Sequence, residues 1–305
     1  MNNYIIAIII IVVMIVVLLL SFIPGYVSTE TVPKIHYPVK SVNHTVPQII
    51  HRTWYSNTMS RVMYETAYKP WIKLNPSYTM IWYNDQDVEK IMKNYGKREY
   101  RAFKKVICGA YKMDLFRLLI LYEYGGVYVD SYSVPNVSVD EMISRSGLGD
   151  EKDIFISILD CEYVVKDAIH NGFILASPKH PFIKQAIKDV LNNIEYGKED
   201  IVMSMTGPLA LSKAIHKCLN HNIPHQIGLN EHAYKYYLFA FHFGFYQHVS
   251  DKNKIMFRKK MDILYCFMYQ KAYKYLSKDK TNYNYANSIG KVCYTDEELF
   301  KLYQL

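Results

Sequence analysis

The sequence predicts an α/β domain, because helical stretches alternate with short apolar runs of strand length that end at acidic or aromatic residues. The central stretch covers residues 110–135. Long apolar residues in its first half predict a buried helix, Gly125-Gly126 ends that helix, and Val127–Val129 predict a short strand. Asp130 follows directly. Ligands of open α/β sheets gather at the carboxyl ends of strands, so Asp130 is a candidate site residue from its placement alone.

The other elements support the same fold class. Val46–Trp54 predicts a proline boundary, a short buried strand and an aromatic residue at the strand's end. Trp71–Asp85 predicts a helix end, an Asn-Pro turn and a second strand. A strongly basic helix is expected over residues 88–105, and another apolar run over residues 154–159 leads to Asp160. Strands and helices therefore alternate through this half of the chain.

The amino-terminal run Tyr4–Ile23 carries no charge and is long enough to cross a bilayer as a helix. We therefore expect a transmembrane signal-anchor in residues 1–25, a stem in 26–45, the main domain in 46–250 and a partly helical extension in 251–305. A cleaved signal peptide is the alternative. No basic residue precedes the apolar run, however, and no small-residue cleavage site follows it.

Composition narrows the class of protein. The 305 residues are 50% hydrophobic, which is enough to bury a substantial core in one main domain. The net charge is +8, and the basic stretch 88–105 is read either as a solvated face or as a surface that attracts an anionic ligand or lipid. Nucleic acid is not expected, because no reader module accompanies the charge. Five widely spaced cysteines predict neither a zinc site nor a disulfide scaffold.

The stretch 110–135 resembles the sugar-binding region of DXD-containing glycosyltransferases, and is most similar to glycosyltransferase family 32, which includes inositolphosphoceramide mannosyltransferases. The family pattern is an Asp, two residues, an Arg, a Leu-Tyr pair, Gly-Gly, a Tyr and then Asp-x-Asp. The positions that match are Asp114, Arg117, Leu121, Tyr122, Gly125, Gly126, Tyr128 and Asp130. Further matches are the opening motif that ends at Trp54, Asn171-Gly172-Phe173, Pro178–Phe182 and Thr206-Gly207-Pro208.

This resemblance implies a GT-A, Rossmann-like nucleotide-sugar-binding domain behind the transmembrane helix. It implies a glycosyltransferase that moves a hexose, with mannose as the first guess, from GDP-mannose or a UDP-hexose to a glycan, lipid or protein acceptor, with retention of configuration. It also implies a single-pass type II protein of Golgi or ER membranes. Lys34 and Lys40, on the carboxyl side of the apolar run, favour the opposite orientation by the positive-inside rule.

The same resemblance assigns roles to residues. Trp54 stacks on the nucleotide base, Asp114 and Arg117 bind hydroxyl groups of the donor sugar, and Asn171 contacts a sugar. Asp130 contacts the nucleotide ribose or a metal ion. From the residues alone, a core side chain is the favoured reading of Trp54, and the spacing of Asp114 and Arg117 predicts a functionally silent ion pair within one helix.

The second acid of the DXD motif is replaced by Tyr132. The negative charge that develops on the departing diphosphate must be stabilised by a metal ion or by cationic donors, and the resemblance implies Mn or Mg. Three outcomes are open: another acid replaces the missing ligand, transfer proceeds without metal, or the protein is inactive and only binds a sugar or nucleotide. Asp160 is the candidate to complete a metal site with Asp130, although a plain strand-end Asp is the alternative. A membrane-anchored protein that interacts with lipids is a further alternative.

Overall fold

The computed structural model describes residues 11–12, 14, 28–36, 45–160, 167–197, 202–242, 248–251, 254–259, 293 and 295–304. Nearly all of the apolar run Tyr4–Ile23 lies outside these residues, as do much of the expected stem and most of the extension after residue 251. Among the helices in the described part of the chain, none has both the length and the apolar character needed to span a bilayer.

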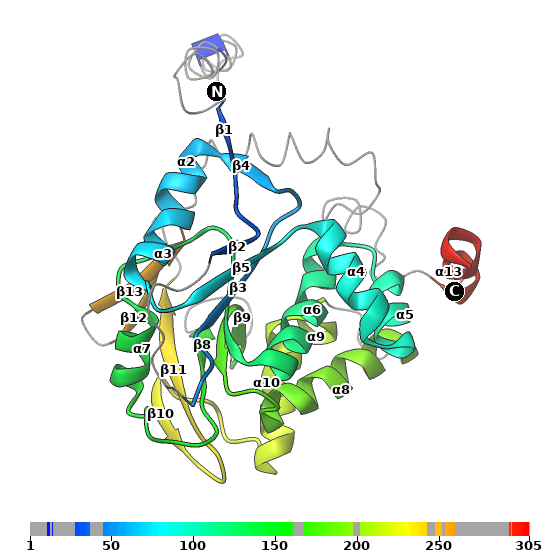
Figure 1. Ribbon diagram of the computed structural model, residues 1–305. Coiled ribbons are helices and arrows are strands. Elements are labelled where there is room, and N and C mark those ends of the chain that lie inside the picture. Colours follow the sequence, from blue (N-terminus) through cyan, green and yellow to red (C-terminus); the bar gives the residue numbers. More distant parts are fainter. Residues whose placement is uncertain are drawn as a thin grey trace, which may run out of the picture.

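One mixed sheet forms the centre of the molecule (Figure 1). Its strands lie in the order β2 (Ile35–His36), β5 (Thr79–Tyr83), β3 (Ile49–Thr53), β6 (Gly126–Val129), β9 (Ile169–Ala176), β8 (Phe155–Asp160), β11 (Lys235–His242), β12 (His248–Asp251), β13 (Lys254–Lys259) and β7 (Ser133–Pro135). β10 (Gly228–Glu231) pairs with β11, and β1 (Thr29–Thr31) pairs with β4 (Thr58–Ser60) in a separate ribbon. β3 is parallel to β5 and β6, β8 is parallel to β11, and β9 lies antiparallel between β6 and β8. The predicted α/β class is confirmed.

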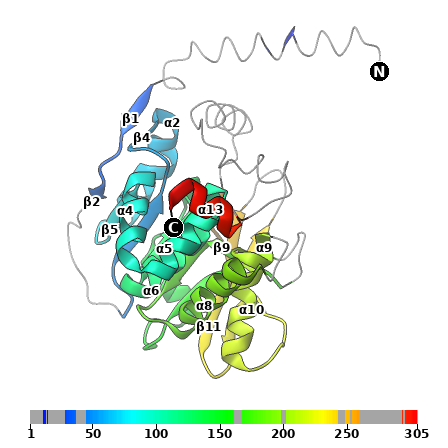
Figure 2. The same ribbon diagram turned by 90° about the vertical axis from the view of Figure 1, so that its right-hand side faces the viewer.

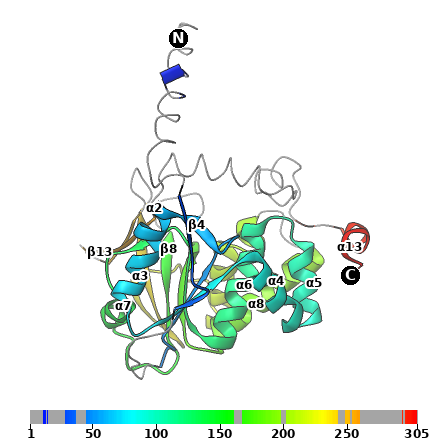
Figure 3. The same cartoon turned by 45° about the horizontal axis from the view of Figure 1, so that its top comes forward.

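Helices cover both faces of this sheet (Figures 1 and 3). One side carries α2 (Arg61–Met63), the π-helix η1 (Tyr64–Tyr68), α3 (Lys69–Leu74) and α7 (Val139–Ser146). The other side carries α4 (Asp85–Tyr95), α5 (Lys97–Lys105), α6 (Gly109–Tyr124), α8 (Pro181–Tyr196), α9 (Val202–Met205) and α10 (Pro208–Leu219). The carboxyl-terminal helix α13 (Asp296–Tyr303) lies against α5 (Figure 2).

Each face of the sheet has its own apolar cluster, because side chains alternate along a strand. On β6, Val127 and Val129 pack into the cluster beneath α2, α3 and α7, whereas Tyr128 packs into the cluster beneath α6, α8 and α10. Gly125 and Gly126 have φ of 63° and 92°, a backbone conformation that side-chain-bearing residues rarely adopt. The expected change from helix to strand at this pair is confirmed, and it brings β6 under α6.

The basic stretch 88–105 differs from the expected single helix. α4 ends at Tyr95 and α5 begins at Lys97, with Gly96 in an extended conformation between them. Gly96 directly precedes α5, and its extended backbone separates the two helices.

Candidate functional site

The site begins on α6, where Asp114 and Arg117 lie three residues apart. Nη2 of Arg117 lies 3.1 Å from Oδ1 of Asp114, and the two side chains are only 7% and 11% exposed respectively. The ion pair expected within this helix is therefore present. It is buried rather than solvated, so the surrounding protein has to supply hydrogen bonds to the remaining polar atoms.

Both oxygens of the Asp114 carboxylate accept hydrogen bonds from other elements. Nδ2 of Asn171 on β9 donates to Oδ1 at 2.9 Å, and Oγ1 of Thr206, just before α10, donates to Oδ2 at 3.0 Å. Burial raises the pKa of Asp114 to about 6, and the nearby Asp130 adds to this; Arg117, Thr206 and Asn171 oppose it. Asp114 thus links α6, β9 and the segment before α10 through hydrogen bonds.

Arg117 extends the cluster to the end of β6. Its Nη1 donates to the carbonyl of Asn171 at 2.5 Å and lies 3.4 Å from Oδ1 of Asp130. The guanidinium also lies 4.5 Å from the centre of the Tyr128 ring. Although burial opposes the charged form, Tyr128, Asp114 and Asp130 together raise the pKa of Arg117 above its usual value. A permanently charged guanidinium therefore faces both carboxylates.

Asp130 is the solvent-accessible member of this cluster, with 27% of its side chain exposed. Its amide donates to the carbonyl of Gly172 on β9 at 2.8 Å. A Cβ at Gly172 would overlap Oδ2 of Asp130, so the glycine leaves room for the carboxylate. The structure thereby brings Asp114, Arg117, Asp130 and Asn171 together, and Asp130 presents the cluster to solvent at the carboxyl end of β6.

Trp54 is buried, with 7% exposure. Its indole donates to the carbonyl of Thr58 at 3.2 Å. The ring of Tyr132 packs edge-on against it at 5.3 Å, and the ring of Tyr55 lies at 5.1 Å. In this conformation Trp54 is a core side chain. Base stacking on Trp54 stays a prediction, and it requires Tyr132 or Tyr55 to move.

Arg52 was not among the residues expected to shape the site. It is fully buried between Trp71 and Trp82, with its guanidinium carbon 5.9 Å and 5.8 Å from their ring centres. Nη2 donates to the carbonyls of Ser131 at 2.6 Å and Asp130 at 3.3 Å. Burial lowers its pKa to about 9. Arg52 therefore holds the backbone that carries Asp130.

One sequence signal pointed towards Arg52. An arginine within an apolar strand needs buried acceptors. Thr206 was expected only as a helix start, yet its side chain contacts Asp114. Neither contact follows from sequence spacing, because each joins elements far apart in the chain.

The donor set for a divalent cation at this site is small. Asp130 is an exposed carboxylate at the strand end, and a Mg²⁺ ion in phosphate sites commonly uses one or two protein carboxylates with substrate oxygens. Tyr132 supplies no second carboxylate. Asp160 ends β8, which β9 separates from β6, and its side chain lies outside the described residues, so its role as a ligand stays a prediction. A cation therefore fits here through Asp130 together with donor phosphates.

Chemically, the cluster balances two acids, Asp114 and Asp130, against two buried cations, Arg52 and Arg117. A carboxylate beside a guanidinium fork suits recognition of neighbouring hydroxyl groups. The cations also lower the cost of bringing an anionic group to the end of β6. The arrangement is thus compatible with a polyol that carries a phosphate.

Comparisons with known proteins locate this region within a family. Residues 61–148 match the family described as "Glycosyltransferase sugar-binding region containing DXD motif". Inositol phosphoceramide mannosyltransferase 1 of Schizosaccharomyces pombe is 27% identical over 177 residues, covering 55% of this chain and 50% of that protein. A mannosyl phosphorylinositol ceramide synthase of Saccharomyces cerevisiae is 24% identical over 169 residues, covering 55% and 42%. The chain spans about half the length of the curated relatives it matches.

Among solved structures, the "PaToxG Glycosyltransferase" aligns with a TM-score of 0.41 and 16% identity, covering 57% of this chain and 70% of that one. The UDP-bound glycosyltransferase domain of the YGT toxin aligns with a TM-score of 0.36 and 12% identity, covering 57% and 78%. The matched family region contains Asp114, Arg117 and Asp130. These matches confirm the resemblance to glycosyltransferase family 32, and residues 61–148 are the part of the chain that is similar to the glycosyltransferase sugar-binding region containing the DXD motif.

Proposed function

We propose that this chain is a glycosyltransferase that transfers a hexose from a nucleotide-sugar donor to a glycan, lipid or protein acceptor. The observation that carries the proposal is the cluster of Asp114, Arg117, Asn171 and Asp130 at the carboxyl end of β6, within and beside the matched family region. Mannose is the first candidate sugar, since one relative of 27% identity is named as a mannosyltransferase and another of 24% identity as a mannosyl phosphorylinositol ceramide synthase.

In the proposed reaction Asp130 faces the donor from the end of β6. Arg117 orients the carboxylate of Asp130 through its Oδ1. Asp114 and Asn171 fix the shape of the sugar pocket behind Asp130. A divalent cation bound through Asp130 would neutralise charge on the departing diphosphate. The GT-A architecture, retention of configuration, and a type II anchor in Golgi or ER membranes belong to the same proposal.

The test is donor hydrolysis and transfer by the full chain with GDP-mannose, UDP-glucose, UDP-galactose and UDP-N-acetylglucosamine, each with Mn²⁺, Mg²⁺ or EDTA. Asp130→Asn keeps the side chain's shape and removes its charge, so we expect turnover to fall by about 100-fold or more. Asp150→Asn, which changes an exposed acid in the loop after α7, is the matched control and should leave turnover unchanged. Equal turnover by wild type and Asp130→Asn would sink the proposal.

A second candidate is a sugar- or nucleotide-binding protein without catalysis, and the observation that favours it is Tyr132 packed against Trp54. This candidate predicts nucleotide-sugar binding without turnover in wild type. Tyr132→Asp restores the second acid of the motif and should then strengthen Mn²⁺ binding in the presence of nucleotide. No binding of any nucleotide sugar would exclude this candidate as well.

The lipid-interaction alternative finds less support in the structure. Arg98 pairs with Glu195 at 2.7 Å, and Arg101 and Lys105 both pair with Asp296 on α13, at 3.1 and 3.3 Å. Ion pairs within the protein therefore neutralise much of the positive charge on α5. We do not propose α5 as a membrane-binding surface.

A further inference from the structure

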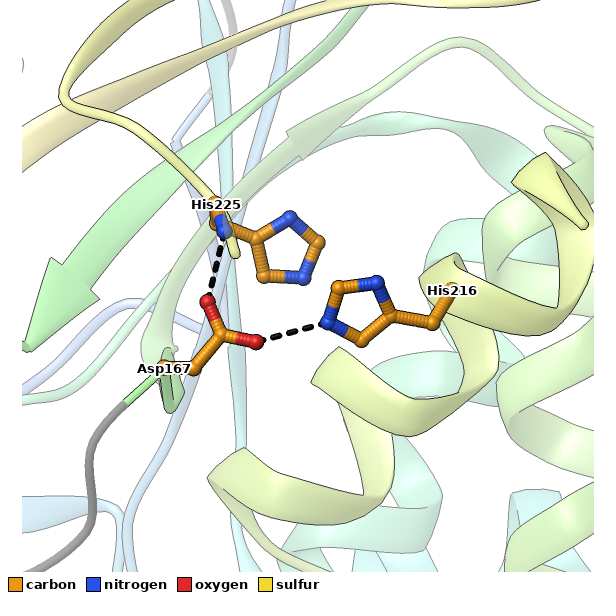
Figure 4. Close-up of side chains that lie close together, drawn as sticks. All are labelled: Asp167, His216 and His225. Carbon is orange, nitrogen blue, oxygen red and sulfur yellow. Dashed lines mark hydrogen bonds and ion pairs between the residues drawn. The ribbon is translucent and has the colours of Figure 1, made fainter. Parts of the chain in front are cut away.

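A second cluster of ligand-type side chains lies on the side of the sheet that α6, α8 and α10 cover, and it is separate from the residues of the proposed donor site (Figure 4). It consists of Asp167, just before β9, His216 on α10 and His225, in the loop before β10. One possible ligand atom from each residue lies within 4.8 Å of those of the other two. Among the described residues, this is the group of His, Cys, Asp and Glu side chains whose geometry suits a metal ion.

Asp167 lies between the two histidines and connects them. Nε2 of His216 lies 2.6 Å from Oδ2 of Asp167, and the backbone amide of His225 donates to Oδ1 at 2.6 Å (Figure 4). The side chains of Asp167 and His216 are 23% and 11% exposed, which leaves a path from solvent for an ion. His216 therefore already directs one ring nitrogen at the carboxylate.

The hydrogen bonds of His225 define its protonation state. Ser212 Oγ donates to the carbonyl of Asp167 at 2.7 Å, so it accepts from Nε2 of His225 at 3.1 Å. Nδ1 of His225 then accepts from the hydroxyl of Tyr236 at 2.8 Å. Because Nε2 donates a hydrogen bond and Nδ1 accepts one, the ring is neutral. A neutral imidazole is the form that binds metal ions.

The other histidine has an unused nitrogen. Nδ1 of His216 is buried and makes no hydrogen bond within the described part of the chain. The rings of His216 and His225 stack at 4.2 Å and 11°. Two charged imidazoles would repel each other at this distance, so the pair favours at least one neutral ring.

We propose that Asp167, His216 and His225 form a Zn²⁺ site distinct from the donor site. Two imidazoles and a carboxylate are a donor set that suits Zn²⁺, with one tetrahedral position left for water. Nε2 of His216 binds the ion, and the proton of Nε2 moves to Nδ1, so the ring stays neutral. His225 turns to present Nε2, while its proton moves to Nδ1, where Tyr236 accepts it and holds the ring.

Such an ion would join three segments, two of which also shape the donor site. Asp167 precedes β9, which carries Asn171, and His216 lies on α10, whose start follows Thr206. Asn171 and Thr206 are the two residues that donate to Asp114. By joining β9 to α10, Zn²⁺ would therefore stabilise the positions of Asn171 and Thr206 without contacting the donor.

The first experiment titrates Co²⁺ and Zn²⁺ into the metal-free full chain, by visible absorption for Co²⁺ and by calorimetry for Zn²⁺. We expect one ion per chain, with the Co²⁺ absorption of a tetrahedral nitrogen and oxygen site. His216→Ala, His225→Ala and Asp167→Asn should each weaken binding by more than about 100-fold, because they remove a ligand. Tyr236→Phe removes only the support of His225 and should weaken binding by about 10-fold.

His232→Ala is the matched control, because His232 is exposed and lies in the same histidine-rich region without belonging to the cluster. The affinity of the His232→Ala variant for Zn²⁺ should equal that of wild type. The proposal is overturned if the wild-type chain binds no equimolar ion, or if binding survives in all three ligand variants. Loss of binding in His232→Ala to the same extent would also overturn the assignment. Should a ligand variant fail to fold, the wild-type spectrum and Tyr236→Phe still decide.

Discussion

The Asp130 carboxylate occupies the space that a side chain at residue 172 would need. A Cβ at Gly172 would overlap Oδ2 of Asp130 and lie 2.6 Å from Cε1 of His170. Gly172→Ala should therefore displace Asp130, weaken donor binding and lower the free energy of unfolding by about 1 to 3 kcal/mol. Urea unfolding and calorimetric donor titration check both effects.

Gly149→Ala is the control for this substitution, because a Cβ there would meet only Cγ2 of Ile143 at 3.8 Å, an ordinary contact. This variant should keep wild-type stability and donor affinity. If Gly172→Ala bound the donor as tightly as Gly149→Ala does, the position of Asp130 would not matter for the donor.

Asp114 gives the protein a pH-dependent stability. Its pKa rises from 3.8 to about 6 in the folded state, chiefly because of burial. Between these values the folded state keeps a proton that the unfolded state has lost, so the free energy of unfolding falls as pH rises through this window. Asp114→Asn lacks this titration. The stability of wild type relative to Asp114→Asn should therefore decrease from about pH 4 to about pH 6 in urea unfolding experiments; parallel pH profiles would contradict the burial argument.

Arg52 connects β3 to η1 and to the loop after β6, through the carbonyls of Ala67 and Ser131, each at 2.6 Å. Arg52→Ala leaves these carbonyls without their donor and should lower the free energy of unfolding by about 2 to 4 kcal/mol. Arg52→Gln retains an amide donor and should lose about half as much. Urea unfolding measures both.

Arg145→Gln provides the comparison, since Arg145 makes an exposed i, i+4 pair with Glu141 at 3.0 Å. Its effect should stay within about 0.5 kcal/mol. A loss in Arg52→Ala no larger than this would show that solvent or backbone rearrangement replaces the buried hydrogen bonds.

Local patterns predicted α6, the Gly125-Gly126 turn and β6, because helix composition, glycine placement and β-propensity act within a few residues. The spacing of Asp114 and Arg117 also predicted their ion pair. What brings Asn171 to them is the antiparallel pairing of β9 with β6, which no local signal specifies. For the same reason, no local signal predicts the contact between Asp167 and His216, which are 49 residues apart in the chain.

The junction between α4 and α5 at Gly96 could not be predicted from the sequence for a different reason. Charge and apolar spacing on both sides suit a helix, so a pattern over residues 88–105 favours one continuous element. A single glycine lowers helix stability by only about 1 kcal/mol, which is too weak to locate a junction by itself. Packing decides it, because the interruption lets α4 and α5 lie against each other.

The whole molecule is built on one sheet shared by two apolar clusters, and its three tryptophans report on only one of them. Trp54, Trp71 and Trp82 all lie in the cluster beneath α2, α3 and α7, whereas the longest described helices, α6 and α8, cover the other cluster. Tryptophan fluorescence therefore follows one face of the sheet, and far-ultraviolet circular dichroism is dominated by helices on the other.

The two faces should unfold together. β6 contributes Val127 and Val129 to one cluster and Tyr128 to the other, so disruption of either cluster exposes the strand on which both depend. We expect the urea midpoints from fluorescence and from circular dichroism to coincide, in a single cooperative transition. Met142→Ala, which opens a cavity beneath α7, should shift both midpoints equally towards lower urea. A fluorescence midpoint that fell while the circular dichroism midpoint stayed fixed would mean that the sheet does not couple its faces, and that the supports of Asp130 can loosen while α6 remains folded.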